Sequence, residues 1–210
     1  MSQGDYEDGR FSSPTGDLTA NLGRMPVIST GDDIIGQSAA INFYISSENG
    51  LMGSSNLEAA QIISISEHLK ELMTAFRALV PWGQEPSAEA LDKWFDGGAT
   101  DISGYAVGAD RSNRFLSWWM GRIEATLGSE GFAVGNKLSL ADVLIYETFA
   151  EYLKDEEAGD LPKFRRESFC SKARTDLALS KYPKISASCE AVASNPNIKK
   201  WLEIRGVQSF

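Results

Sequence analysis

Between residues 57 and 80, apolar side chains recur every three or four positions, which places them on one face of a single long helix. Pro81 removes a backbone donor, so we expect the helix to end just before it. From about residue 55 onward the chain has patterns typical of helices almost throughout. The apolar face of the long helix consists of Ile62, Ile65, Leu69, Leu72, Met73, Phe76 and Val80.

Further helical segments follow this helix. A second long helix is expected at about 111–128, where Phe115, Trp118, Trp119, Ile123 and Leu127 form an apolar stripe, and glycines and aspartates in the preceding stretch 96–110 favour a loop. The other expected helices cover "SAEALDKWF" (87–95), a segment within 136–153, "YPKISASCEAVASN" (182–195) and "PNIKKWLEIR" (196–205), the last with Pro196 in its first turn.

The first fifty residues have a different pattern. "MPVIS" (25–29) and "DDIIG" (32–36) are typical of two short strands joined by turn residues, and Gln37 or Ser38 is expected to begin a helix. "SENGLMGSSN" (47–56) has the polarity and glycine content of a linker. The sequence therefore predicts two unequal modules, residues 1–47 with strands and residues 56–210 all helical.

Composition argues against several classes of function. A formal net charge of -9 over 210 residues disfavours a nucleic-acid partner, since phosphate neutralisation needs concentrated Lys and Arg. Two cysteines and one histidine, His68, support neither a disulfide scaffold nor a metal site. The polar, acidic N-terminus and the lack of a run of about 18 apolar residues predict neither a secretory signal nor a membrane span. We therefore expect a cytoplasmic protein without metal.

Ser139 and Asp142 have the spacing of a capping box, in which the Ser139 hydroxyl and the Asp142 carboxylate each accept a bond from the other's backbone amide. Leu138 and Val143 occupy the flanking staple positions. Such a box stabilises the start of a buried helix by about 1 kcal/mol. Alone it indicates folding and carries no chemistry.

The context of this box is more specific. "GNKLSLADVLIY" (135–146) and "YPKISASCEAVASNPNIKKWLEIR" (182–205) resemble two motifs of the C-terminal helical domain of the glutathione S-transferase family. The resemblance extends over most of residues 22–203 and is closest to the sigma-like, tyrosine-type branch. It implies a thioredoxin-like α/β module, here shortened, followed by an all-helical domain. It also implies a homodimer that binds glutathione as co-substrate and conjugates the thiolate to a hydrophobic electrophile.

By this resemblance, Met25 precedes a cis-proline, Pro26, and turns its backbone NH and CO outward to pair with the tripeptide as an added strand would. Gln37 and Ser38 match the pair that holds the γ-glutamyl carboxylate at a helix N-terminus, and Arg24 matches an auxiliary contact. Each position also has a simpler interpretation: an edge-strand proline, a helix cap and a solvated charge.

The chain departs from the family pattern before Met25. Only 24 residues stand there, and "YEDGRF" (6–11) fits the family's second strand, so we expect the first strand and helix to be missing. The catalytic Tyr, Ser or Cys of the family follows that first strand, and Tyr6 is a poor substitute. Ser13 and Asp17 stand where the branch has Trp and Lys. An N-terminal module that is incomplete, rearranged or completed by a partner is expected, and an active enzyme and a non-catalytic binding or interaction module both stay open.

Two charged features have alternative interpretations. Glu71 on the long helix matches an acid that reaches across a dimer interface in this branch, although a solvated helix-face charge is favoured. The basic run "KFRRESFCSKAR" (163–174) is interpreted as a solvated or partner-facing loop in preference to a nucleic-acid contact.

Overall fold

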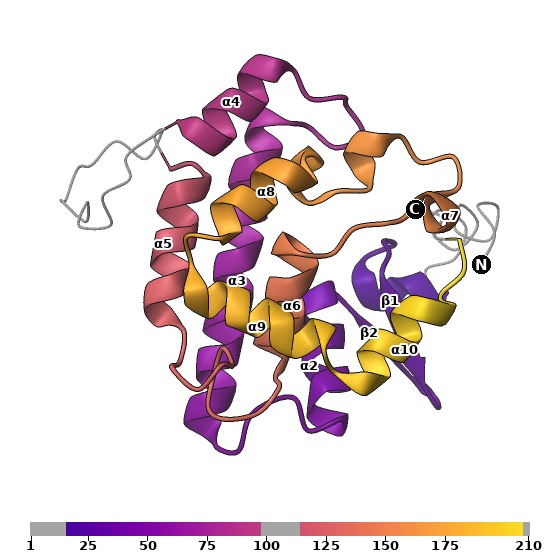
Figure 1. Ribbon diagram of the computed structural model, residues 1–210. Coiled ribbons are helices and arrows are strands. Elements are labelled where there is room, and N and C mark those ends of the chain that lie inside the picture. Colours follow the sequence, from indigo (N-terminus) through magenta and orange to yellow (C-terminus); the bar gives the residue numbers. More distant parts are fainter. Residues whose placement is uncertain (1–15, 98–113, 208–210) are drawn as a thin grey trace, which may run out of the picture. The chain divides into compact units, whose positions relative to one another are not determined.

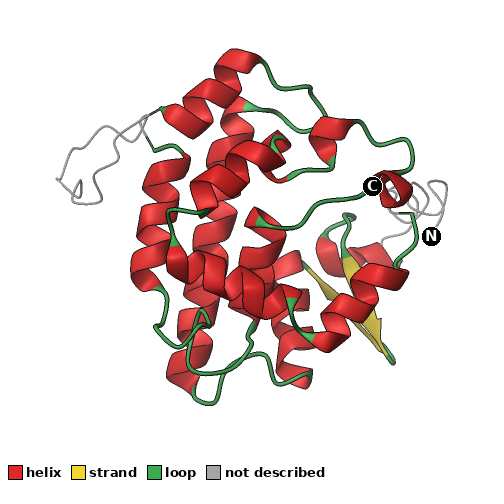
Figure 2. Cartoon of the chain, viewed as in Figure 1, coloured by secondary structure: helices red, strands yellow, loops and turns green. Residues whose placement is uncertain are grey.

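The computed structural model describes residues 16–97 and 114–207. The chain divides into two compact units, Met1–Met52 and Gly53–Phe210. The first contains the strands and the second is helical (Figure 1, Figure 2). "YEDGRF", Tyr6, Ser13 and most of the loop expected at 96–110 lie outside the described residues, so expectations about them stay predictions.

The first unit is built around a β-hairpin. A short 3-10 helix, η1 (Asp17–Asn21), precedes strands β1 (Val27–Thr30) and β2 (Asp33–Gly36), and helix α2 (Ser38–Glu48) follows. The strands pair antiparallel with Val27 opposite Gly36 and Thr30 opposite Asp33. Gly31 opens the two-residue loop with φ +69°, the conformation that a hairpin glycine supplies. The predicted strands and the start of the helix at Ser38 are confirmed.

Gly36 is the point where η1 packs against β2. A Cβ on Gly36 would lie 2.5 Å from the Cβ of Asn21 and 2.6 Å from the carbonyl oxygen of Ala20. Asn21 is buried, and its Nδ2 donates to the carbonyl of Pro26 at 3.0 Å. Asn21 therefore connects η1 to the chain entering β1, and only glycine fits at the end of β2.

The second unit is a helical assembly in which α6 contacts both α3 and α9 (Figure 1). The buried stripe predicted for the long helix is confirmed for Ile62, Ile65, Leu69, Leu72 and Phe76, and the helix ends at Leu79 before Pro81. The described helices of the second unit are α3 (Asn56–Leu79), α4 (Ala88–Asp96), α5 (Leu116–Thr126), α6 (Leu140–Phe149), α7 (Asp155–Ala158), α8 (Lys172–Leu179), α9 (Pro183–Ala193) and α10 (Pro196–Ile204), with 3-10 turns η3 (Lys163–Arg165) and η4 (Ser168–Cys170).

The second long helix is shorter than predicted. Residues 114 and 115 are not helical, and α5 begins at Leu116. Phe115 has an extended backbone, and the indole Nε1 of Trp119 donates to the carbonyl of Arg114 at 3.1 Å. The Trp119 side chain thus takes the Arg114 carbonyl, which a longer helix would use for its own backbone hydrogen bond. Residues 111–113 lie outside the described residues.

The basic run at 163–174 has more local structure than the predicted loop, while its predicted exposure to a partner stays a prediction. It folds into η3, η4 and the start of α8. Arg166 pairs with Asp155 at 2.7 Å, and Arg174 pairs with Asp92 at 2.8 Å and Asp96 at 2.6 Å. These carboxylates lie outside the run, so the pairing of Arg166 and Arg174 was not visible in the run itself.

A buried aromatic cluster holds η4 against α3, α4 and α6. The ring of Phe169 lies 5.2 Å from that of Phe76, 5.4 Å from that of Trp94 and 5.9 Å from that of Phe149, between centroids. Tilted and edge-on arrangements at these distances are the favourable ones for aromatic pairs. Phe169 therefore anchors a segment that has little regular structure of its own.

Two buried polar centres complete the second unit. Asp142, fully buried at the start of α6, accepts four hydrogen bonds: from the Ser139 amide at 2.9 Å, from the Ser139 hydroxyl at 2.7 Å, from the Ala133 amide at 2.7 Å and from the Ser188 hydroxyl at 2.7 Å. Both halves of a capping box join Ser139 and Asp142. The carboxylate thus ties α6 to α9 and to the preceding loop as well as capping its own helix.

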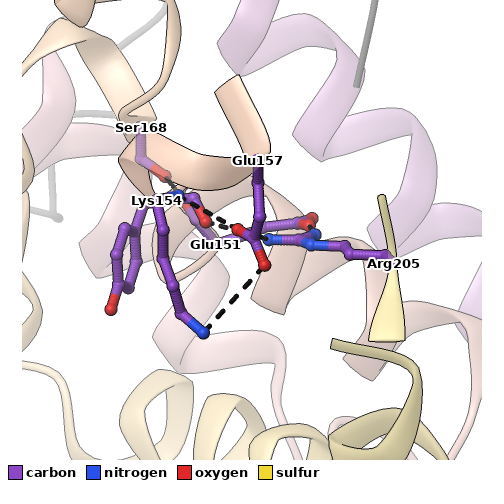
Figure 3. A network of polar contacts seen from close by, with 6 residues as sticks. Glu151, Lys154, Glu157, Ser168 and Arg205 are labelled. Carbon is purple, nitrogen blue, oxygen red and sulfur yellow. Dashed lines mark hydrogen bonds and ion pairs between the residues drawn. The ribbon is translucent and has the colours of Figure 1, made fainter. Parts of the chain in front are cut away.

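The other centre is Arg205, which follows α10 (Figure 3). Its guanidinium pairs with Glu151 and with Glu157, the latter at 3.1 Å, and donates to the carbonyl of Tyr152 at 3.0 Å. The backbone amide of Lys154 also donates to Glu157, at 3.0 Å. The end of the described chain is thereby joined to α7 and the segment after α6.

Candidate functional site

The hairpin register brings four of the predicted site residues to one end of the first unit. Because Val27 lies opposite Gly36, the residues just outside this pair, Pro26 and Gln37, lie at the open end of the hairpin. Met25 precedes Pro26 through a cis peptide bond, and Ser38 follows Gln37 as the first residue of α2. The segments on either side of the hairpin thus meet at the same edge.

The N-terminus of α2 is open at this edge. The first helical hydrogen bond of α2 runs from the Ile41 amide to the Gln37 carbonyl at 3.0 Å, so the amides of the first turn precede the helical ladder. Gln37 makes no side-chain cap hydrogen bond, and both Gln37 and Ser38 are exposed. A helix N-terminus with free amides and adjacent amide and hydroxyl groups suits a carboxylate or another anion.

Gln37 has an uncommon backbone. Its φ is +70° with ψ 123°, a conformation that non-glycine residues adopt rarely and at a cost of about 1 to 3 kcal/mol. Such residues are concentrated at ligand sites, where the surrounding structure fixes them. Here Gly36, locked against Asn21, and the α2 helix hold Gln37 from either side.

Charge is distributed unequally along the hairpin. Arg24 is exposed beside Met25, with its amide donating to the Asn21 carbonyl at 3.1 Å and its Nε to the same oxygen at 3.4 Å. Asp32 and Asp33 lie at the turn, four strand residues and about 13 Å away. The positive end of the α2 dipole and Arg24 therefore occur together at the end that carries Met25 and Ser38.

Within residues 16–52 no side chain can be assigned as the group that activates a thiol. The tyrosine of this stretch, Tyr44, lies half-buried inside α2. Cys170 and Cys189 are free thiols of the second unit. Burial, with a further contribution from the Asp142 charge, raises the pKa of Cys189 to about 12, and burial also raises the pKa of Cys170. Neither thiol is activated as a nucleophile.

The remaining candidates lie on α3. His68 is exposed, with Nε2 3.4 Å from the Ser64 hydroxyl, as expected for a helix-face histidine. Glu71 is exposed and lines a groove of about 410 Å³ together with Lys70 and Trp119. In residues 16–97 and 114–207 no three His, Cys, Asp or Glu side chains converge as a metal site would require, and no helix is long and apolar enough to cross a membrane.

Sequence reasoning did not identify the residues that position this edge. Asn21 and Gly36 belong to no predicted site, yet they join η1 to both strands. The available signal was a glycine at the last position of a strand, which indicates close approach of another backbone.

Comparisons with known proteins bear on the family and the fold of the chain. Residues 108–205 match the family model for "Glutathione S-transferase, C-terminal domain". A Caenorhabditis elegans protein, "Probable glutathione S-transferase 7", is 27% identical over 98% of this chain and 87% of that protein. "Hematopoietic prostaglandin D synthase" of Gallus gallus is 26% identical over 95% of this chain and 83% of that protein.

Solved structures of other proteins share the fold of this chain. A monomeric glutathione S-transferase from the hookworm Necator americanus superimposes with a TM-score of 0.68 at 22% identity, covering 100% of this chain and 84% of that one. The glutathione S-transferase from Ascaris lumbricoides gives a TM-score of 0.61 at 23% identity, with the same coverage. The chain has the glutathione S-transferase fold, as predicted, and the three comparisons together support that family.

Proposed function

We propose that this chain is a glutathione S-transferase that binds glutathione at the open end of the β1–β2 hairpin, the edge formed by Met25, Pro26, Gln37 and Ser38. The observation that carries the proposal is the strand register, which puts the Met25–Pro26 segment beside the exposed N-terminus of α2. The relatives named as glutathione S-transferases and the shared fold support it.

The ligand would be held at two points. The backbone of Met25 lies outside both strands and takes no part in the hydrogen bonds of the described hairpin, so its NH and CO can pair with an extended peptide as a further strand would. The carboxylate of the γ-glutamyl group would be bound by the Ser38 hydroxyl, the Gln37 amide and the first amides of α2. Arg24 would lie beside the bound tripeptide.

The reaction would be addition of the glutathione sulfur to an apolar electrophile. The thiol proton is given up as the thiolate forms, and the sulfur then bonds to the electrophilic carbon. In the same step either a carbon–halogen bond breaks and halide leaves, or a conjugated π bond breaks and the resulting carbanion takes up a proton from water. Lowering the thiol pKa from about 8.5 toward neutrality would be the main catalytic contribution. The group that does this is not assigned. The sigma-like branch and a role in detoxification belong to the same proposal.

A non-catalytic binding protein of the same fold is the second candidate. One observation favours it: within residues 16–52, no tyrosine or cysteine lies next to Met25 at the hairpin edge. The two candidates share the binding step and differ only in turnover.

Assembly and location are also proposed. A homodimer would use the exposed face of α3 that carries Glu71. The groove lined by Glu71 and Trp119 offers a surface for a second copy. A cytoplasmic location would suit the two free thiols. Light scattering of the purified chain measures the assembly directly, and a monomer at micromolar concentration would refute the dimer.

Calorimetric titration with glutathione tests the binding step. Ser38→Ala removes a charge-assisted hydrogen bond and is expected to weaken binding about tenfold. Ser47→Ala, at the far end of α2, is the matched control and leaves affinity unchanged. No detectable heat up to millimolar glutathione would overturn the proposed site. If binding is found, a conjugation assay with an aryl halide then separates the enzyme from the non-catalytic protein.

A further inference from the structure

The end of α3 and the segment containing η3 meet at an exposed tryptophan. The side chain of Trp82 is 69% exposed. The Cζ of Arg77 lies 4.6 Å from the centroid of its ring, and the Cζ of Arg165 lies 5.1 Å from the same centroid. Two guanidiniums from different elements therefore share one indole, and these three residues form the Arg–Trp–Arg cluster.

Neither guanidinium of this cluster has an acidic partner in the part of the chain that the structure describes. Neighbouring arginines do: Arg166 pairs with Asp155 at 2.7 Å, and Arg174 pairs with two aspartates of α4. Burial lowers the pKa of Arg77 and the charge of Arg165 lowers it further, although Cys170 opposes these effects. Two like charges thus lie beside one indole without an acidic partner among the described residues, in a chain whose net charge is -9.

The segment that carries Arg165 is fixed in place. The carbonyl of Arg166 accepts from the Leu153 amide at 2.9 Å, and Tyr152 and Glu167 form a β-bridge. Farther along, Phe169 lies in the aromatic cluster, 5.2 Å from Phe76, the residue before Arg77. The two positively charged groups are therefore preorganised, and a ligand would not have to order them.

Backbone strain is present in the same segment. Phe169 and Cys170 have φ of +49° and +60°, and neither is a glycine. Each such residue costs on the order of 1 to 3 kcal/mol and persists only where the surroundings enforce it. The burial of Phe169 holds these two residues in that conformation. The chain bends at Phe169 and continues into α8, while Arg165 of η3 lies beside Trp82.

We propose that the Arg–Trp–Arg cluster is a docking site for an acidic segment of a partner protein. Its carboxylates would pair with Arg77 and Arg165, and an apolar side chain of the segment would cover the Trp82 ring. Arginine frequently binds carboxylates through two parallel hydrogen bonds, and tryptophan and arginine are enriched among the few residues that carry most of the binding energy of an interface.

The small number of positive charges in the cluster favours this occupant over a membrane. Anionic lipid surfaces are bound by clusters of about four to eight Lys and Arg, whereas this cluster has two in a chain of net charge -9. A flat aromatic surface beside two charges also suits an extended peptide better than a small inorganic anion, which would leave the indole uncovered.

Fluorescence anisotropy with a fluorescein-labelled deca-glutamate peptide carrying one central phenylalanine tests the proposal at about 50 mM salt, where screening is weak. The double variant Arg77→Gln/Arg165→Gln is expected to weaken binding about tenfold, since two charge pairs are lost. Trp82→Ala, which removes the aromatic surface, is expected to weaken it about fivefold. Lys181→Gln/Lys199→Gln removes the same charge from two exposed side chains elsewhere and should leave affinity within about twofold.

Three results would overturn the proposal: no binding up to about 1 mM peptide, an equal loss in the lysine control, or binding of phosphatidylserine vesicles or inorganic phosphate without binding of the peptide. A conservative double variant, Arg77→Lys/Arg165→Lys, keeps the charge but not the planar fork and should give an intermediate affinity. Saturating glutathione should not compete, which distinguishes this surface from the hairpin edge.

Discussion

Asp142 and Arg205 are both buried charged side chains of the helical unit, but their surroundings differ. Asp142 is a carboxylate that accepts four hydrogen bonds from backbone amides and serine hydroxyls, without an ion pair among the described residues. Arg205 is paired with two carboxylates, and its Nε has no partner in the same part of the chain. Neutral amides and hydroxyls supply all the hydrogen bonds of the Asp142 carboxylate. The Arg205 guanidinium is only partly hydrogen-bonded, and its partners are carboxylates that must themselves be desolvated.

The largest expected effect is the loss of the Asp142 carboxylate. Asp142→Ala leaves buried amides of Ala133 and Ser139 and a buried hydroxyl of Ser188 without acceptors, and each unsatisfied group costs about 1 to 3 kcal/mol. We expect the free energy of unfolding to fall by about 4 kcal/mol, measured by urea denaturation. The control is Glu190→Ala, which removes an exposed carboxylate from α9 and should change stability by less than about 0.5 kcal/mol.

Removing Arg205 is expected to cost less, about 3 kcal/mol. Arg205→Met leaves Glu157, 5% exposed, without its principal partner, and an uncompensated buried charge is the main cost. Adding Glu157→Gln to Arg205→Met should recover part of the loss, because the unpaired charge is gone. If the double variant were as unstable as the sum of the two single variants, the ion pair would not be the source of the effect.

The contrast also explains what the sequence could predict. Ser139 and Asp142 are three residues apart, so their capping box was visible in the sequence, as was the hairpin, whose turn glycine and short apolar runs are local signals. Ser188 and Glu157 are 46 and 48 residues from the side chains they contact, and no local pattern links them. At the hairpin edge, Gln37 and Ser38 follow from the motif. The contact of Asn21 with Pro26 spans only five residues, but it depends on the packing of η1 against the strands, which no motif indicates.

Acidification should affect the Arg205 centre through Glu157. The hydrogen bond from Arg205 holds the pKa of Glu157 below its ordinary value, and burial opposes this without reversing it. A carboxyl whose folded pKa is depressed stabilises the fold above its unfolded pKa of about 4.3, and this stabilisation is lost as pH falls through the folded pKa. Thermal unfolding between about pH 7 and pH 3 should show a steeper loss for the wild type than for Arg205→Met/Glu157→Gln. Parallel curves would mean that Glu157 contributes no pH dependence.

The smallest expected effect tests whether the four bonds to Asp142 are equivalent. Ser188→Ala removes the hydroxyl that reaches Asp142 from α9, but Oδ1 keeps the Ala133 amide at 2.7 Å. The carboxylate stays partnered and no donor is left unsatisfied, so the loss should be about 1 kcal/mol, that of one net hydrogen bond. The comparison is Ser186→Ala, on the same helix as Ser188. The Ser186 hydroxyl donates to the carbonyl of Leu179, at the end of α8, at 2.9 Å. A loss for Ser188→Ala near that of Asp142→Ala would show that the link between α6 and α9, more than the helix cap, is what this buried carboxylate stabilises.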